Sequence, residues 1–85
     1  MKFSMKKVTV LLADGFEEIE ALTVVDLLRR AKVYVDTVSI TDDYTVRGAH
    51  GIPVQTEDLI TEIDFKESDM IVLPGSKNTM EDLLW

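Results

Sequence analysis

The 85-residue sequence contains no cysteine, which excludes disulfide bonds, thiolate metal sites and a cysteine nucleophile within it. It is also poor in basic residues, since 9 lysines and arginines against 16 acidic residues give a net charge of −7. This charge argues against nucleic acid or an anionic membrane as a partner. No apolar run reaches the roughly 18 residues of a membrane span, and no signal-peptide region begins the chain. We therefore expect a small cytoplasmic protein.

Three apolar segments have the length and composition of buried strands. They are residues 8–13 (VTVLLA), 33–40 (VYVDTVSI) and 69–74 (DMIVLP). Parallel connections of this kind place the first strand between the other two, in the order 2-1-3. Gly48 and Gly51 predict a small hairpin before the third strand, and residues 59–65 predict a helical turn. The sequence thus predicts one α/β unit over residues 1–85.

A helix is expected over residues 16–31, between the first two strands. Asp14 and Gly15 form a turn before it, and Asp14 has the spacing of a capping box with Glu17. Lys32 follows the helix at a position that glycine would favour.

One carboxylate of this helix falls within its apolar arc. At 100° per residue, Glu20 lies between Leu27 and Ala31 on the helical wheel. Glu17 and Glu18 have a simpler explanation, because anions are favoured at a helix N-terminus. A carboxylate that points into the interface between helix and sheet needs a partner or a function, unless it stays hydrated at the rim of the sheet. We predict that Glu20 is more buried than Glu17 and Glu18 and, if unpaired, resists ionisation.

The segment LLADGFEEIEALTVVDLLRRA resembles the opening of the ThiJ/PfpI family, which includes the parkinsonism-associated deglycase and chaperone-like protein. The resemblance runs from about residue 6 to residue 57, and it implies a flavodoxin-like, class I glutamine-amidotransferase-like fold in three layers. In that family a glutamate of the first helix hydrogen-bonds a reactive cysteine, and the matching residue is Glu20. The family's cysteine lies beyond the third strand, and this chain ends before it. The resemblance therefore implies half of the fold, with the acid and without the nucleophile.

Residues 69–85 depart from that family, because LPGSKNTMEDLLW lacks the two glycines that usually follow the proline. This segment resembles the glutamine-amidotransferase domain of cobyric acid synthases, which has the same fold. We therefore expect an engineered or truncated chimera joined near residues 65–69, with a ThiJ/PfpI-like part over residues 1–65 and a cobyric-acid-synthase-like part over residues 66–85.

The turn after the third strand has no expected catalytic role. The resemblance implies that the backbone N–H groups of Gly75 and Ser76 occupy the places of an oxyanion hole. Without a nucleophile there is no oxyanion to stabilise, so both this turn and Glu20 are interpreted as vestigial. The PGSKNT sequence lacks the spacing of a nucleotide-binding loop. A weakly held anion is the remaining alternative for the turn.

The sequence offers no metal or cofactor site. His50, the single histidine, is expected to be exposed on a glycine-flanked loop without a second metal ligand. The resemblance implies instead that Arg30 and His50 match basic residues near the family's dimer cleft. No motif supports a Ser–His–Asp triad, so no catalytic, cofactor-binding or metal-binding residue is expected.

We expect a chain without independent catalysis that folds and forms a homodimer, with no small-molecule substrate. One alternative is part of a ThiJ/PfpI hydrolase, deglycase or chaperone that needs a further half to supply the cysteine. Another is a module that binds a small ligand or anion. If the chain forms a homodimer, a second copy would cover the apolar edge of the third strand. The expected interface residues are Met70, Ile71, Val72, Leu73, Leu83, Leu84 and Trp85.

Overall fold

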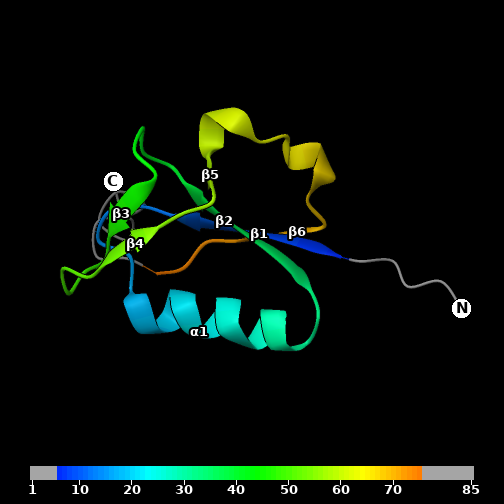
Figure 1. Ribbon diagram of the computed structural model, residues 1–85, viewed down its shortest axis with the longest axis horizontal. Helices are drawn as coiled ribbons and strands as arrows, with labels where there is room; N and C mark the ends of the chain where they lie inside the picture. Colours follow the sequence, from blue (N-terminus) through cyan, green and yellow to red (C-terminus); the bar gives the residue numbers. More distant parts are fainter. Residues whose placement is uncertain (1–5, 76–85) are drawn as a thin grey trace, which may run out of the picture.

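A parallel β-sheet with a helix on one face forms the centre of the computed structural model (Figure 1). The structure describes residues 6–75. Its elements are β1 (Lys7–Leu12), α1 (Glu18–Arg30), β2 (Tyr34–Ser39), β3 (Thr45–Arg47), β4 (Pro53–Gln55), β5 (Asp58–Leu59), the 3₁₀ turns η1 (Ile60–Glu62) and η2 (Phe65–Glu67), and β6 (Met70–Val72).

The strand order of the sheet is β5-β2-β1-β6, and all three pairings are parallel. The predicted strands are β1, β2 and β6, so the expected order 2-1-3 is confirmed. Strands on both sides of the expected join at residues 65–69 belong to this one sheet. Among residues 6–75, no helix has the length and hydropathy to cross a bilayer.

The central strand β1 is covered on both faces. Val8, Val10 and Leu12 pack against α1 on one face, and all three are buried. Thr9 points to the other face, where its side chain contacts Ser68, the residue after η2. Figure 1 shows α1 on one side of the sheet and the η1–η2 segment on the other. Burial on both faces accounts for the nearly continuous apolar run of β1.

The helix α1 begins later than predicted, and the predicted capping box is wrong. Its N-cap is Glu17, whose side chain makes no capping hydrogen bond. The Asp14 carboxylate instead accepts a hydrogen bond from the backbone N–H of Arg47, at 3.1 Å. Phe16 is anchored in the core, with 1% of its surface exposed. Both contacts are made to residues distant in sequence, so local spacing could not reveal them.

A Schellman motif ends α1. The N–H of Val33 donates to the carbonyl of Leu28 at 3.0 Å, and the N–H of Lys32 donates to the carbonyl of Arg29 at 3.1 Å. Lys32 adopts a left-handed conformation with φ 66°. The glycine-like position predicted for Lys32 is confirmed, and lysine adopts it at a steric cost.

The segment between β2 and β6 contains the expected hairpin, formed by β3 and β4. The helical turn expected at residues 59–65 corresponds to η1 and η2. The sequence did not predict β5, which pairs with β2 through two residues only. A two-residue strand is too short to show an alternating pattern.

The strand β6 is less buried than predicted. Exposed fractions are 57% for Met70, 48% for Ile71 and 56% for Leu73, and Val72 is half-buried. Among the described strands β6 pairs only with β1, so its other edge is open. The prediction of a buried third strand is wrong for the described part of the chain, because no described element covers that edge.

Candidate functional site

Three glutamates at the start of α1 lie in three different environments. Glu18 is buried, with 4% of its surface exposed, whereas Glu17 is half-buried and Glu20 is exposed. The prediction that Glu20 is the most buried of them is wrong. The stripe of α1 that faces the sheet is narrower than the predicted arc and runs through Ala21 and Val25. Glu20 lies at the side of this stripe.

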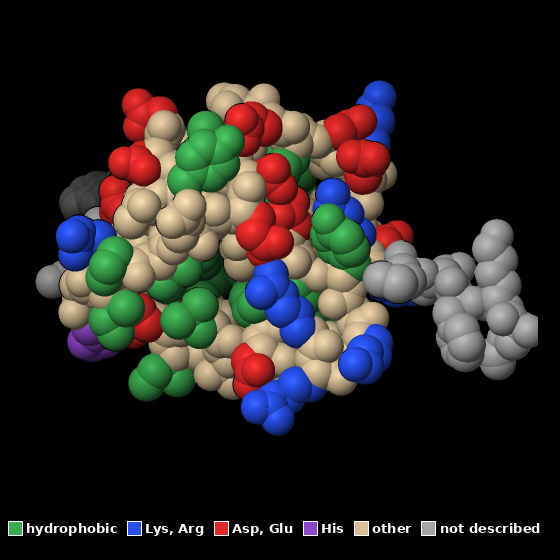
Figure 2. Space-filling view, viewed as in Figure 1, with side chains coloured by type: hydrophobic (Ala, Val, Ile, Leu, Met, Phe, Trp, Pro, Cys, Tyr) green, Lys and Arg blue, Asp and Glu red, His purple; other side chains and the backbone are tan. Residues whose placement is uncertain are grey.

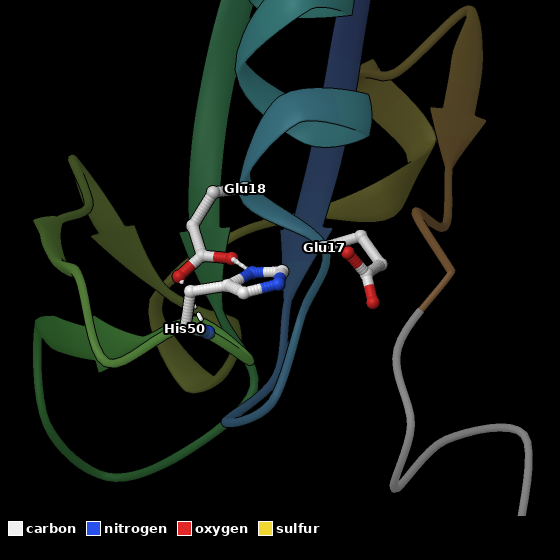
Figure 3. A group of neighbouring side chains, drawn as sticks. All are labelled: Glu17, Glu18 and His50. Carbon is white, nitrogen blue, oxygen red and sulfur yellow. Dashed lines mark hydrogen bonds and ion pairs between the residues drawn. The ribbon is translucent and has the colours of Figure 1, made fainter.

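The Glu18 carboxylate joins α1 to the loop between β3 and β4. One oxygen, Oε2, accepts hydrogen bonds from the backbone N–H groups of His50 at 2.9 Å and Ile52 at 3.3 Å. The other, Oε1, lies 2.8 Å from Nδ1 of the His50 ring. Figure 3 shows the carboxylate and the ring facing each other. The loop therefore satisfies both oxygens of a buried charge.

Gly48 leaves the space that the Glu18 carboxylate occupies. A Cβ atom at Gly48 would lie 2.2 Å from Cδ of Glu18, which is far inside van der Waals contact. Glycine is thus required here for close approach. Gly48 is the sequence signal that could have indicated a close contact between its loop and another element.

The hydrogen bonds control the ionisation of this pair. Burial alone raises the pKa of Glu18, but hydrogen bonds from the His50 ring and from the backbone outweigh burial and lower the pKa to about 2. The hydrogen bond to Glu18, together with the charges of Glu18 and Glu17, raises the pKa of His50 above its usual range. Because an ionised carboxylate can only accept hydrogen bonds, Nδ1 of His50 carries a proton and donates a hydrogen bond to Oε1.

His50 is exposed as predicted, with 70% of its side chain accessible. The expectation that it has no neighbouring metal ligand is wrong. Ligand atoms of Glu17, Glu18 and His50 all lie within 4.8 Å of one another. Arg30 pairs with Asp26 at the far end of α1, so a single chain does not bring Arg30 and His50 together.

The predicted vestigial site is assembled in part. The Glu20 carboxylate lies over Gly75, since its Oε2 is 3.4 Å from the place a Cβ atom would take there. The N–H of Glu17 donates to the carbonyl of Gly75 at 2.9 Å, which fixes the end of β6 against the start of α1. Ser76 lies outside the described residues, as do the three C-terminal interface residues, Leu83, Leu84 and Trp85.

A second acidic group lies between β2 and β5. Asp36 is buried, with 3% of its surface exposed. Burial, a hydrogen bond with the Asp58 carboxyl and the charges of Asp58 and Glu57 raise its pKa to about 6, although Lys7 opposes the shift. Sequence reasoning missed Asp36 because the groups that surround it, such as Asp58 and Lys7, are distant in sequence. The pair of Asp36 and Asp58 lies on β2 and β5, outside the contact between Glu18 and the β3–β4 loop.

The strand order and the crossover helix α1 define an α/β protein of flavodoxin-like topology. A model of the DJ-1/PfpI family matches residues 6–84. The chain therefore belongs to the DJ-1/PfpI family. It is 39% identical to Protein DJ-1 homolog A of Arabidopsis thaliana over 72 residues, which are 85% of this chain and 18% of that protein.

A solved structure of oxidized DJ-1 from Toxoplasma gondii matches the fold with a TM-score of 0.82 and 37% identity, over 86% of this chain and 40% of that chain. A probable cobyric acid synthase of Thermococcus onnurineus is 43% identical over 47 residues, 55% of this chain and 9% of that protein. This stretch is longer than residues 69–85 alone. The family match also spans both sides of residues 65–69, and a join there stays a prediction.

Proposed function

We propose that this chain is a non-catalytic α/β unit of the DJ-1/PfpI family that assembles with a second copy of itself through β6. The observation that carries the proposal is the exposure of Met70, Ile71 and Leu73 on a strand whose outer edge is unpaired among the described elements. An open apolar edge offers backbone donors and acceptors to another strand. One self-complementary edge serves both copies of a twofold dimer.

A hollow beside β6 supports assembly through the same surface. It measures about 340 Å³ and is lined by Lys6, Val8, Leu28, Val33, Asp69 and Met70. Its floor is the apolar side of β1 and α1, which a second copy would remove from water. Burial of apolar surface contributes about 25 cal/mol per Å², enough to outweigh the repulsion between two chains of net charge −7.

Light scattering at micromolar concentration tests the assembly. The chain is expected to have twice its monomer mass of 9.6 kDa, and Ile71→Glu is expected to give a monomer. Ile19→Glu is the matched control, because Ile19 is 80% exposed on α1 and lines a different hollow, with Glu18 and Ile52. A folded monomer at all concentrations would contradict the proposal. So would a dimer that Ile19→Glu disrupts and Ile71→Glu does not.

The absence of cysteine from the 85 residues supports the non-catalytic part of the proposal. General acid–base assistance by a carboxylate alone gives only about 10²–10⁴-fold acceleration. We expect no glutaminase, esterase or methylglyoxal-deglycase activity above a buffer blank. Activity that co-purifies with the chain and disappears in Glu20→Gln would show that this expectation is wrong.

One observation favours a second candidate function, in which the chain contributes the acid side of a DJ-1/PfpI-type catalytic site. The Glu20 carboxylate is exposed and lies over Gly75, where the family resemblance implies a reactive cysteine nearby. A separately produced polypeptide that carries such a cysteine would then restore activity, and Glu20→Gln would abolish it. No activity in the mixture, despite formation of a complex, would exclude this candidate.

A further inference from the structure

The imidazole ring of His50 is held at one nitrogen and open at the other. Glu18 receives the Nδ1 hydrogen bond at 2.8 Å and the backbone N–H at 2.9 Å, so both the ring and its backbone are fixed. The other nitrogen, Nε2, makes no hydrogen bond or ion pair with any of residues 6–75. Because 70% of the side chain is exposed, Nε2 is accessible from solvent.

Glu17 provides a carboxylate on the opposite side of this ring. Figure 3 shows the His50 ring between the Glu18 and Glu17 side chains. Glu17 is fixed through its backbone, since its N–H donates to Gly75 and its carbonyl accepts from the N–H of Ala21. Its carboxylate makes no hydrogen bond or ion pair with the described residues. It is therefore free to rotate towards Nε2.

The spacing of these groups is compatible with a metal ion. Their ligand atoms lie within 4.8 Å of one another. Zinc binds imidazole nitrogen and carboxylate oxygen at about 2.0–2.2 Å, which places two such ligands roughly 3.5 Å apart in a tetrahedral site. The Glu17 carboxylate has no partner among the described residues, so rotation of its side chain towards Nε2 can shorten the remaining distance.

The arrangement behind the ring is the one that metal-binding histidines use. Such a histidine donates its second ring N–H to a carboxylate, which fixes the tautomer and orients the free nitrogen towards the metal. Glu18 occupies that position, and only 4% of its surface is exposed. One imidazole nitrogen and a carboxylate suit zinc and its neighbours Cu²⁺ and Ni²⁺, whereas Mg²⁺ prefers oxygen ligands alone.

We propose that His50 Nε2 and the Glu17 carboxylate bind a divalent transition-metal ion of the zinc class, with Glu18 as the positioning residue that orients His50. Water completes the coordination on the exposed side. The site joins the start of α1 to the loop between β3 and β4, so the bound ion also ties these two elements together.

Calorimetric titration with Zn²⁺ tests the site on the untagged chain. The unsubstituted chain is expected to bind one ion, His50→Gln to lose at least about 10-fold in affinity, and Glu17→Gln to lose about 10-fold. Glu67→Gln is the matched charge control, because Glu67 is exposed at the end of η2, and it is expected to bind as the unsubstituted chain does. Mg²⁺ is expected to bind at least about 10-fold more weakly than Zn²⁺.

A spectroscopic readout distinguishes this site from general attraction of cations to a chain of charge −7. His50 is the single histidine, so bound Cu²⁺ is expected to show the paramagnetic resonance signature of one imidazole nitrogen, and His50→Gln is expected to remove it. Zinc affinity that is unchanged in both His50→Gln and Glu17→Gln would overturn the proposal. An equal loss in Glu67→Gln would overturn it too. If His50→Gln does not fold, Glu17→Gln decides the matter, because its side chain has no partner among the described residues to lose.

Discussion

Gly48 and Glu18 depend on each other at the scale of single residues. The carboxylate fills the space beside Gly48 and accepts three hydrogen bonds from the loop that contains it. A methyl group at position 48 would force the carboxylate out of this space and leave a buried charge without its partners. The loop and the start of α1 would then separate.

We expect Gly48→Ala to lower the free energy of unfolding by about 2–3 kcal/mol, measured by urea denaturation. Gly51→Ala is the control. Gly51 has φ +79° but nothing within 4 Å of the added methyl group, so only backbone strain of about 1 kcal/mol applies. Equal losses in the two variants would mean that the contact with Glu18 is unimportant.

Asp36 makes the second prediction at this scale. Its pKa is about 6 in the folded chain, against an ordinary value of 3.8, because of burial and the neighbouring charges of Asp58 and Glu57. The folded chain therefore retains a proton that the unfolded chain has released between about pH 4 and pH 6. The stabilising contribution of this group is fully present below pH 3.8 and is lost as the pH rises through about 6.

Asp36→Asn is expected to stabilise the chain at pH 7 by about 1 kcal/mol, which raises the melting temperature by about 4–8 °C for a domain of this size. The gain should disappear near pH 4, where Asp36 is protonated in both states. Asp42→Asn, at an exposed position, is expected to have no effect at either pH. A gain from Asp36→Asn that is independent of pH would contradict the electrostatic explanation.

At the scale of elements, the end of α1 combines correct hydrogen bonding with an unfavourable residue. Both hydrogen bonds of the Schellman motif are formed, and Leu28 and Val33 pack against the core beside it. Lys32 nevertheless has φ 66°, a conformation that glycine adopts freely and that strains most L-residues other than asparagine and aspartate.

Lys32→Gly is expected to stabilise the chain by about 0.5–1 kcal/mol, despite the greater freedom of glycine in the unfolded state. Thermal unfolding followed by circular dichroism measures the difference. Lys32→Ala removes the charge and keeps the strain, so it is expected to change stability very little. If Lys32→Ala stabilised the chain as much as Lys32→Gly does, the cost at this position would come from the charge of Lys32. The left-handed conformation would then carry no cost.

The elements that could be predicted from the sequence are those whose pattern is local. The apolar runs of β1, β2 and β6 and the glycines of the hairpin were sufficient for the strand order and the β3–β4 excursion. Contacts between distant residues decided the rest. The two residues of β5, the start of α1 and the burial of Glu18 each depend on a partner more than 15 residues away. The burial of Glu20 was predicted wrongly, because a helical wheel gives the direction in which a side chain points but not which element packs against it.

At the scale of the whole molecule, the net charge of −7 opposes the proposed assembly. Figure 2 shows acidic side chains (red) gathered over much of one face. Two such chains repel each other in water, and salt screens this repulsion over about 10 Å at 0.1 M ionic strength. Salt also weakens the attraction between opposite charges, but the apolar contacts at β6 do not depend on such attraction.

We therefore expect the dimer to become tighter, by several-fold in dissociation constant, as NaCl rises from about 0.02 M to about 0.5 M. Analytical ultracentrifugation measures the change, and Ile71→Glu should stay monomeric throughout. The melting temperature should also rise with protein concentration, because association stabilises the folded chain by mass action. Weaker association at high salt would indicate an interface held by ion pairs, contrary to the proposal.

The pairing of β1 with β6 has a consequence for folding during synthesis. Its first contact joins Lys7 to Asp69, which are 62 residues apart, whereas β1, α1 and β2 are contiguous in sequence. A ribosome that adds about 5–20 residues per second takes roughly 3–12 s to make the intervening chain. During that time the position of β6 beside β1 is vacant in the βαβ unit, and β1 carries the core residues Val8, Val10 and Leu12. The nascent chain thus presents its central strand as a temporary edge, and it needs protection from other unfolded chains at that moment more than at any later one.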